Sequence, residues 1–127
     1  MDLAVVDTMP HTSAASSLAA AKADLILIPC QPTPFDIAAV GSSIEIAKAR
    51  QKRCVVILNR APLRAPEIAE ARKALDAYNV AVYPHEITDR RTYFRAVTQG
   101  LSVTEFEPQS AASKEIITLW HWIKEIL

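Results

Sequence analysis

Polar side chains stand where short apolar runs of the sequence end. Asp7 follows the run at residues 3–6, and Asn59 and Arg60 follow the run at residues 54–58. A carboxylate at the tip of a buried strand is costly unless it is paired or binds a metal, and in phosphoryl-transfer enzymes an acid at this place holds Mg²⁺. Asparagine offers the donor and the acceptor that an adenine edge requires. The ordinary structural alternatives are a loop cap for Asp7 and an Asx turn for Asn59.

A basic cluster lies in the last third of the chain. Its members are Arg90, Arg91 and Arg95, and it stands beside Tyr93 and Phe94. Such a cluster can meet the phosphates of a nucleotide or of DNA. It can equally be a solvated helix face.

The two glycines exclude two kinds of nucleotide site. Gly41 and Gly100 are 59 positions apart (100 − 41 = 59) in a chain of 127 residues. The phosphate loop G-x-x-x-x-G-K-[ST] and the dinucleotide loop G-x-G-x-x-G each need two glycines within one short turn. The chain therefore carries no complete nucleotide cradle of either kind.

The composition is that of one globular domain over residues 1–127, with 50% apolar and 22% charged residues. Lys+Arg and Asp+Glu number 14 each, so there is no overall basic field to attract nucleic acid. No apolar run is long enough to cross a membrane and no secretory signal is visible, so we expect a cytoplasmic protein. Cys30 and Cys54 are expected to be reduced thiols, and the scattered histidines predict no metal site.

The apolar runs predict the fold class. Continuous apolar strands are typical of a parallel sheet, which is buried on both faces. Successive runs begin 22 to 29 residues apart, which leaves room for one crossover helix each. We therefore expect an α/β fold, a parallel sheet with flanking helices, whose ligands bind beyond the carboxyl ends of the strands. The expected strands are residues 3–6, 25–28, 54–58 and 80–83, the last stopped by Pro84.

Five helices are expected between and after these strands. Gly41 and Ser42 weaken the second, and the last should bury Ile116, Ile117, Trp120, Ile123 and Leu127, with one tryptophan ring exposed. The first helix should have a cap at Thr12 or Ser13 and end at residue 23, and the second should have a cap at Asp36. The third should start at Pro66 and end near residue 78, followed by Asn79. The fourth should have a cap at Thr88 or Asp89 and end at Gly100, and the fifth should have a cap at Ser110 and end at residue 127.

Together these segments resemble the plasmid and chromosome partition ATPases of the ParA/MinD type. The runs that carry the resemblance are VVDTMPHTS, DLILIPCQPTPFDI, VVILNRAP and PHEITDRRTYFRAVTQGLSV. They occur in the family's order and spacing and cover essentially the whole chain. D-T-x-P-H followed by I-P-x-Q-P-[ST]-P-F-D is the most specific part. The resemblance implies a partial P-loop NTPase fold, which is Rossmann-like.

The resemblance also implies roles for the residues on the phosphate side. Asp7 matches the acid that bonds the Mg²⁺ shell and the attacking water, which makes it the expected catalytic and metal-side residue. Thr8, Met9 and Pro10 match the switch loop that senses the γ-phosphate, although the family usually has proline where Met9 stands.

Other matched positions lie on the base side and on the surface. Asn59 matches the strand end that contacts adenine, and Arg60 follows it as a further nucleotide-binding candidate. Pro84 and its neighbours match the loop that packs against the base. Arg90, Arg91 and Arg95 lie where members of the family place basic residues that face DNA.

The resemblance implies an ATP- and Mg²⁺-dependent partition protein that forms a homodimer and binds DNA and a ParB-like partner, without a membrane. The family's loop K-G-G-x-G-K-T is absent, so the chain resembles only the C-terminal half of such an ATPase. We therefore expect the chain alone to be inactive and to bind ATP no more tightly than about millimolar. The strand that carries the loop in related folds lies between the strands expected at residues 3–6 and 25–28, which predicts a gap there.

Two other functions are compatible with parts of the sequence. One is a non-catalytic dimerisation or partner-binding module that uses exposed strand edges. The other is a phospho-accepting receiver domain, suggested by the length and by Asp-x-Met-Pro. The second is disfavoured because Asp7 has no earlier strand that carries acidic residues.

Overall fold

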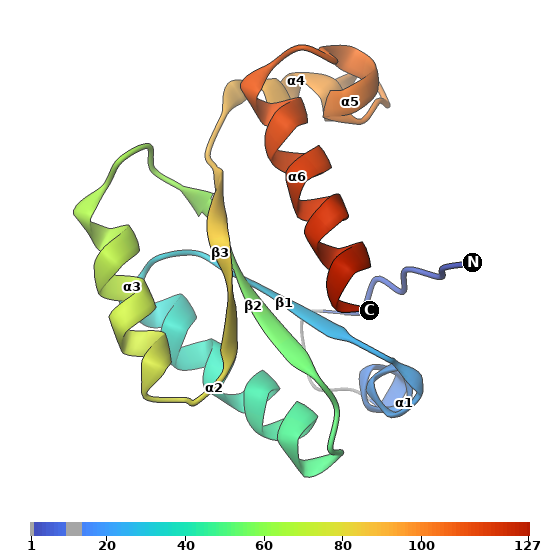
Figure 1. The fold of residues 1–127 in the computed structure, drawn as a ribbon, viewed down its shortest axis with the longest axis vertical. Coiled ribbons are helices and arrows are strands. Elements are labelled where there is room, and N and C mark those ends of the chain that lie inside the picture. The colour runs from blue at the N-terminus through green and yellow to red at the C-terminus, as the bar shows by residue number, and fades with distance from the viewer. Residues whose placement is uncertain (1, 10–13) are drawn as a thin grey trace.

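The computed structural model describes residues 2–9 and 14–127. The strands form one parallel sheet in the order β1-β2-β3, with helices on both faces (Figure 1), so the expected α/β class is confirmed. The elements are α1 (Ala14–Lys22), β1 (Ile26–Cys30), α2 (Pro34–Ala49), β2 (Cys54–Ala61), α3 (Pro66–Asp76), β3 (Ala81–Thr88), α4 (Arg91–Thr98), α5 (Val103–Phe106) and α6 (Ala111–Ile126).

Two hydrophobic cores lie on opposite faces of the sheet. Helices α2 and α3 cover one face, where Val56 and Leu58 of β2 are fully buried. Helix α6 lies on the other face, where Val55 and Ile57 of β2 pack with Tyr83. The central strand β2 is thus buried on both sides, as its continuous apolar run predicted.

The prediction of a strand at residues 3–6 is wrong. Residues 2–9 have no regular secondary structure, and the side chains of Leu3, Val5 and Val6 are 44%, 85% and 68% exposed. A strand obtains its hydrogen bonds from a neighbour, and the resemblance places another strand between this run and β1. Within residues 2–9 and 14–127 no strand pairs with the outer edge of β1, so the run has no ladder to join.

Strand β1 is covered on only one face, although its apolar run predicted burial on both. Ile28 and Cys30 point into the core under α2, whereas Leu27 is 38% exposed and Pro29 is exposed on the other side. β1 therefore presents an unpaired edge and an open apolar face in the part of the chain that the structure describes.

Strand β3 does not stop at Pro84, which is a second correction. It continues to Thr88, and its pairing with β2 shifts between Val82 and Glu86, opposite Val56 and Leu58. Proline lacks the amide donor of a regular ladder, but it is tolerated at bulges and on edge strands. Because β3 is an edge strand of this sheet, the chain accommodates Pro84 as part of a bulge.

Several helix limits differ from the expected ones. Thr33, rather than Asp36, caps α2 and accepts the backbone N–H of Asp36, and the helix continues unbroken through Gly41. Arg90 precedes α4 in place of a Thr88 or Asp89 cap, because Thr88 still belongs to β3. The short helix α5 was not expected. The proposed caps Thr12 and Ser13 lie outside the described residues.

Other expected limits are confirmed. Asn79 adopts φ 50° after α3, and Gly100 adopts φ 69° after α4. There the N–H of Leu101 donates to the carbonyl of Ala96 (3.0 Å) and the N–H of Gly100 to that of Val97 (2.9 Å), which is a Schellman ending. Ser110 caps α6 by accepting the N–H of Ser113.

The buried face of α6 is rotated from the expected one. Ile116 and Ile123 face the sheet as expected. Ile117, Trp120 and Leu127 are instead 40–41% exposed. Their expected places in the core are taken by Leu119, Trp122 and Ile126, so the partly buried tryptophan is Trp122, where Trp120 was expected.

Candidate functional site

The carboxyl ends of β2 and β3 meet at one edge of the sheet. There the backbone N–H of Asp89 donates to the carbonyl of Ala61 (2.8 Å), which joins the last residue of β2 to the residue that follows β3. Ligands of parallel α/β sheets bind at this edge. The candidate site is therefore built from the segments around Asn59 and Asp89.

Asn59 and Arg60 lie in a bulge at the end of β2. Leu58 pairs with Glu86 and Ala61 with Thr88, so β2 has one residue more than β3 between these pairs. Arg60 adopts φ 49°, a left-handed conformation that is uncommon outside glycine. Bulges of this kind occur next to active sites, where they redirect side chains.

The Asn59 amide is available to a ligand. Its side chain is half-buried and makes no hydrogen bond with the described part of the chain, so the Asx-turn alternative is not observed. A half-buried amide with an unused donor and acceptor suits the edge of a base.

The structure does not bring the other two predicted nucleotide-side residues to this place. Pro84 lies within β3, four residues before the strand ends, and Thr88, Asp89 and Arg90 follow at the edge instead. Asp7 lies on the exposed segment of residues 2–9, outside the sheet. Their roles stay predictions, and neither position supports them.

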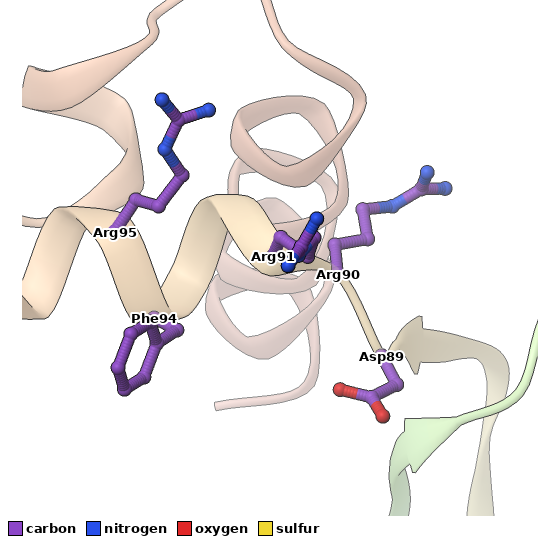
Figure 2. A pocket seen from close by; sticks show the side chains of 5 residues that line it. All are labelled: Asp89, Arg90, Arg91, Phe94 and Arg95. Carbon is purple, nitrogen blue, oxygen red and sulfur yellow. The ribbon is translucent and has the colours of Figure 1, made fainter.

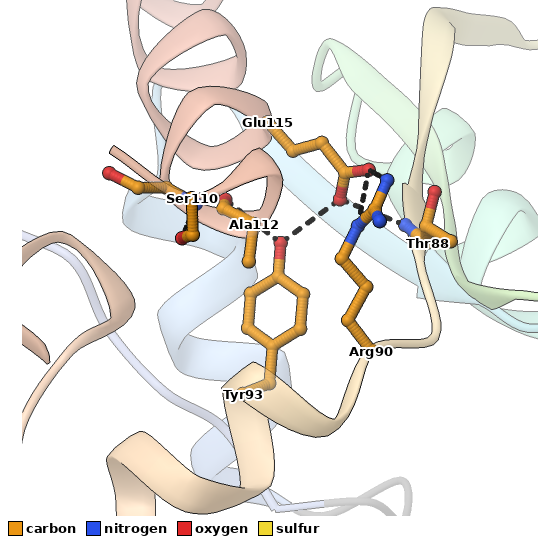
Figure 3. A network of polar contacts seen from close by, with 7 residues as sticks. Thr88, Arg90, Tyr93, Ser110, Ala112 and Glu115 are labelled. Atoms are coloured by element: carbon orange, nitrogen blue, oxygen red, sulfur yellow. Dashed lines mark hydrogen bonds and ion pairs between the residues drawn. The ribbon is translucent and has the colours of Figure 1, made fainter. Parts of the chain in front are cut away.

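Glu115 of α6 organises the residues that follow β3 (Figure 3). One carboxylate oxygen accepts from Nε and Nη2 of Arg90 (3.1 and 2.9 Å), and the other accepts the N–H of Thr88 and the hydroxyl of Tyr93 (both 3.1 Å). The Tyr93 hydroxyl also lies 3.2 Å from the carbonyl of Ala112. A carboxylate with four donors fixes α6, α4 and the end of β3 to one another.

Burial and the nearby Glu115 charge raise the pKa of Tyr93 well above its ordinary value. Burial, with the same carboxylate, also raises the pKa of Tyr83, whose ring packs against Trp122. Both phenols therefore stay neutral at physiological pH, and Tyr93 acts as a hydrogen-bond donor.

The predicted arginine cluster divides into two parts. Arg90 is paired with Glu115, and its side chain is 28% exposed. Arg91 and Arg95 are exposed on α4 and have no carboxylate within ion-pair distance among the described residues. DNA binding by the cluster stays a prediction, and only these two arginines have unneutralised charge to offer.

A hollow of about 630 Å³ lies beside these arginines at the start of α4 (Figure 2). Asp89, Arg90, Arg91, Phe94 and Arg95 line it. In this view Phe94 and Asp89 lie below the helix and Arg95 lies above it. The Phe94 side chain is 74% exposed.

Sequence reasoning missed Glu115 and Asp89. Asp89 had been considered only as a helix cap. Nothing in the spacing links Glu115 to Arg90, which is 25 residues earlier. Glu115 stands at helical spacing before Leu119, Trp122 and Ile126, and a carboxylate in line with such apolar residues is the one signal that could have drawn attention to it.

The remaining ionisable groups offer little chemistry. Cys30 and Cys54 are free thiols, as expected, and burial with the nearby Asp36 charge raises the pKa of Cys30 to about 11. A thiol with so high a pKa is a poor nucleophile. Within residues 2–9 and 14–127, no three His, Cys, Asp or Glu side chains gather as a metal site. In the same part of the chain, no helix is both long enough and apolar enough to span a bilayer.

Comparison with known proteins finds two distant relatives with one name. The chain is 25% identical over 122 residues to the maintenance of carboxysome distribution protein A of Halothiobacillus neapolitanus (91% of this chain, 56% of the relative). It is 25% identical over 116 residues to the protein of that name from Gloeobacter kilaueensis (89% and 54%). No family model matches the chain.

These matches support the resemblance to ParA-like proteins at the level of the family and nothing finer. The chain spans about half the length of the relatives that it matches.

Proposed function

We propose that this chain forms the base-binding half of a ParA-like positioning ATPase. The observation that carries the proposal is the Asn59 bulge at the carboxyl edge of the sheet, joined to Asp89 after β3. The order of the sequence motifs and the two carboxysome-distribution relatives support it. The whole protein would use ATP to position a cargo within the cell, as a homodimer with a ParB-like partner.

The described residues suit one end of ATP only. The Asn59 amide can pair with a base edge, and the end of β3 provides a fixed backbone beside it. The same residues offer neither a glycine-rich phosphate cradle nor a cluster of metal ligands. The described part of the chain therefore does not fit a complete Mg²⁺–triphosphate site, and no hydrolytic step is assigned to it.

Nucleotide titration followed by two-dimensional ¹H–¹⁵N NMR tests the base-binding role. We expect ATP to shift the signals of Asn59, Arg60 and residues 88–90 with a dissociation constant no tighter than about 1 mM, because the charge-assisted phosphate contacts are missing. Asn59→Ala should abolish these shifts, whereas Asn79→Ala, at an exposed asparagine after α3, should leave them unchanged. Shifts confined to other parts of the chain would contradict the proposal.

A phosphate-release assay tests whether the chain is inactive alone. We expect no Mg²⁺-dependent turnover of ATP above the buffer control. Turnover that Asp7→Ala abolishes would show that residues 2–9 complete a catalytic site, contrary to this proposal.

A non-catalytic interaction module is the second candidate function. The unpaired edge of β1 and the open face at Leu27 favour it, because natural proteins usually cover or charge such edges. DNA binding stays a prediction of the sequence resemblance.

A further inference from the structure

Helix α4 presents an apolar stripe with a basic border to solvent. Phe94 and Val97 are each 74% exposed, and Leu101, just beyond the helix, is 38% exposed. Arg91 and Arg95 border one side of this stripe, three residues before and one residue after Phe94. We call these five residues the α4 surface: Arg91, Phe94, Arg95, Val97 and Leu101.

The α4 surface is held in a fixed position. On its inner side Ala96 is buried, and Tyr93 donates to Glu115. At its end the Schellman hydrogen bonds of Gly100 and Leu101 fix the backbone that carries Leu101. A preformed surface loses little conformational freedom when a partner binds.

From this arrangement we propose that the α4 surface docks an acidic amphipathic segment of a partner protein. Aromatic residues and arginine are enriched at protein interfaces, and they often supply most of the binding energy. Leucine-like side chains of the partner would cover Phe94 and Val97 and fill the hollow, while its carboxylates would pair with Arg91 and Arg95. This inference does not depend on nucleotide binding by the chain.

The charges of this region favour a protein segment over DNA. The hollow contains the Asp89 carboxylate, which repels phosphate, and Arg90 is neutralised by Glu115. Two arginines make few phosphate contacts, and a DNA backbone would leave the apolar stripe without a partner. A flat anionic membrane suits it no better, because α4 has only 8 residues and Asp89 lies in the hollow beside it.

Fluorescence anisotropy with a defined probe tests the proposal. The probe is a fluorescein-labelled helical peptide of about 18 residues, with leucines along one face and glutamates beside them. Two control peptides replace the leucines by serine or the glutamates by glutamine. We expect the probe to bind at about 0.15 M salt, and both control peptides to bind at least tenfold more weakly.

Matched protein variants locate the binding. Phe94→Ser and Arg95→Gln should each weaken binding of the probe by about tenfold. Leu18→Ser on α1 and Arg53→Gln before β2, at exposed residues elsewhere, should not change it. Circular dichroism should show that all four variants keep the fold, since each residue is exposed.

Three results would overturn the proposal. The first is no binding of the probe up to about 1 mM protein. The second is binding that Phe94→Ser leaves unchanged. The third is binding of a short DNA duplex or of phosphatidylglycerol vesicles, in place of the probe, that Phe94→Ser and Arg95→Gln both weaken.

Discussion

Glu115 is the residue on which the arrangement at the end of β3 depends. Its carboxylate accepts hydrogen bonds from Thr88, Arg90 and Tyr93, so one side chain joins the end of a strand to two helices. The network also decides which arginines can meet a partner, because it uses the charge of Arg90.

The raised pKa of Tyr93 predicts a pH dependence of stability. The unfolded chain releases the phenol proton near pH 10, whereas the folded protein retains it to higher pH. The contribution of Tyr93 is therefore complete below about pH 10 and is lost as the pH rises further. Urea unfolding of the native protein should show a fall in the free energy of unfolding above pH 10, and Tyr93→Phe should make this fall smaller. The fall in the free energy of unfolding that remains in Tyr93→Phe comes from Tyr83 and other groups.

This prediction would be contradicted if the free energy of unfolding fell equally above pH 10 in the native protein and in Tyr93→Phe. Loss of the Glu115 hydrogen bond should lower the stability of Tyr93→Phe by about 1–2 kcal/mol at neutral pH, and this offset is separate from the slope.

Cys30 and Cys54 should differ in reactivity. Cys30 is 3% exposed with a pKa near 11, whereas Cys54 is only partly buried. Because the thiolate is the reactive form, iodoacetamide at neutral pH should modify Cys54 first and reach Cys30 only when the protein opens. Peptide mass spectrometry at successive times measures both rates, and urea should make them equal. Equal rates in the folded protein would be inconsistent with the buried position of Cys30.

At the level of single residues, the sequence predicted the position of Asn59 correctly and that of Pro84 wrongly. The Asn59 amide stands at the expected edge because strand ends follow directly from the apolar run at residues 54–58. Pro84 does not stand at the expected edge. It lies at a bulge of an edge strand, and proline does not end a strand there. Glu115 could not be predicted, since its partners are brought together only by the packing of α6.

Among the elements, α2 shows why a glycine can be placed in a helix. An added Cβ at Gly41 would lie 2.8 Å from Cε1 of Tyr78, whose hydroxyl donates to the carbonyl of Ile37. Gly41 therefore allows Tyr78, which lies two residues beyond α3, to pack closely against α2, although glycine lowers helix propensity.

Gly41→Ala should destabilise the protein by about 1–3 kcal/mol, because overpacking exceeds the gain in helix propensity. Ser43→Ala, at an exposed position of the same helix, is the matched control and should be neutral or slightly stabilising. Thermal unfolding followed by circular dichroism measures both. A stabilised Gly41→Ala variant would show that the ring of Tyr78 moves aside at little cost.

The helices and strands were predictable to the extent that local pattern determines them. The runs that became β1, β2 and β3 were each identified, and the caps at Gly100 and Ser110 were placed correctly. The strand at residues 3–6 failed because a strand depends on a neighbour that the local pattern does not contain. The predicted buried face of α6 was wrong for a similar reason, since the sequence of this helix is apolar on more than one side.

On the scale of the whole molecule, the main feature is an incomplete covering of the sheet. Among residues 2–9 and 14–127 no strand pairs with the outer edge of β1, and Leu27 and Trp120 are 38% and 40% exposed. Exposed strand edges promote pairing between chains.

We expect the chain to self-associate through β1. Sedimentation velocity should show a sedimentation coefficient that rises with concentration, and Leu27→Lys should return the protein to a monomer because charge on an edge strand opposes pairing. Leu63→Lys is the control: it changes a 65% exposed leucine outside the strands and should not return the protein to a monomer. A native protein that stays monomeric up to about 0.5 mM would argue against this prediction and against the interaction-module function.

The two cores also differ in when they can form during synthesis on the ribosome. The core under α2 and α3 uses residues before 81, apart from Val82, so it can close early. The opposite face, with Val55, Ile57 and Tyr83, waits for α6 (Ala111–Ile126), which is made after every strand that it covers. A nascent chain thus carries a bare apolar face for a long stretch of translation. Chaperones that recognise apolar surface would have their longest opportunity to bind it there, and stalling before residue 111 should prolong that exposure.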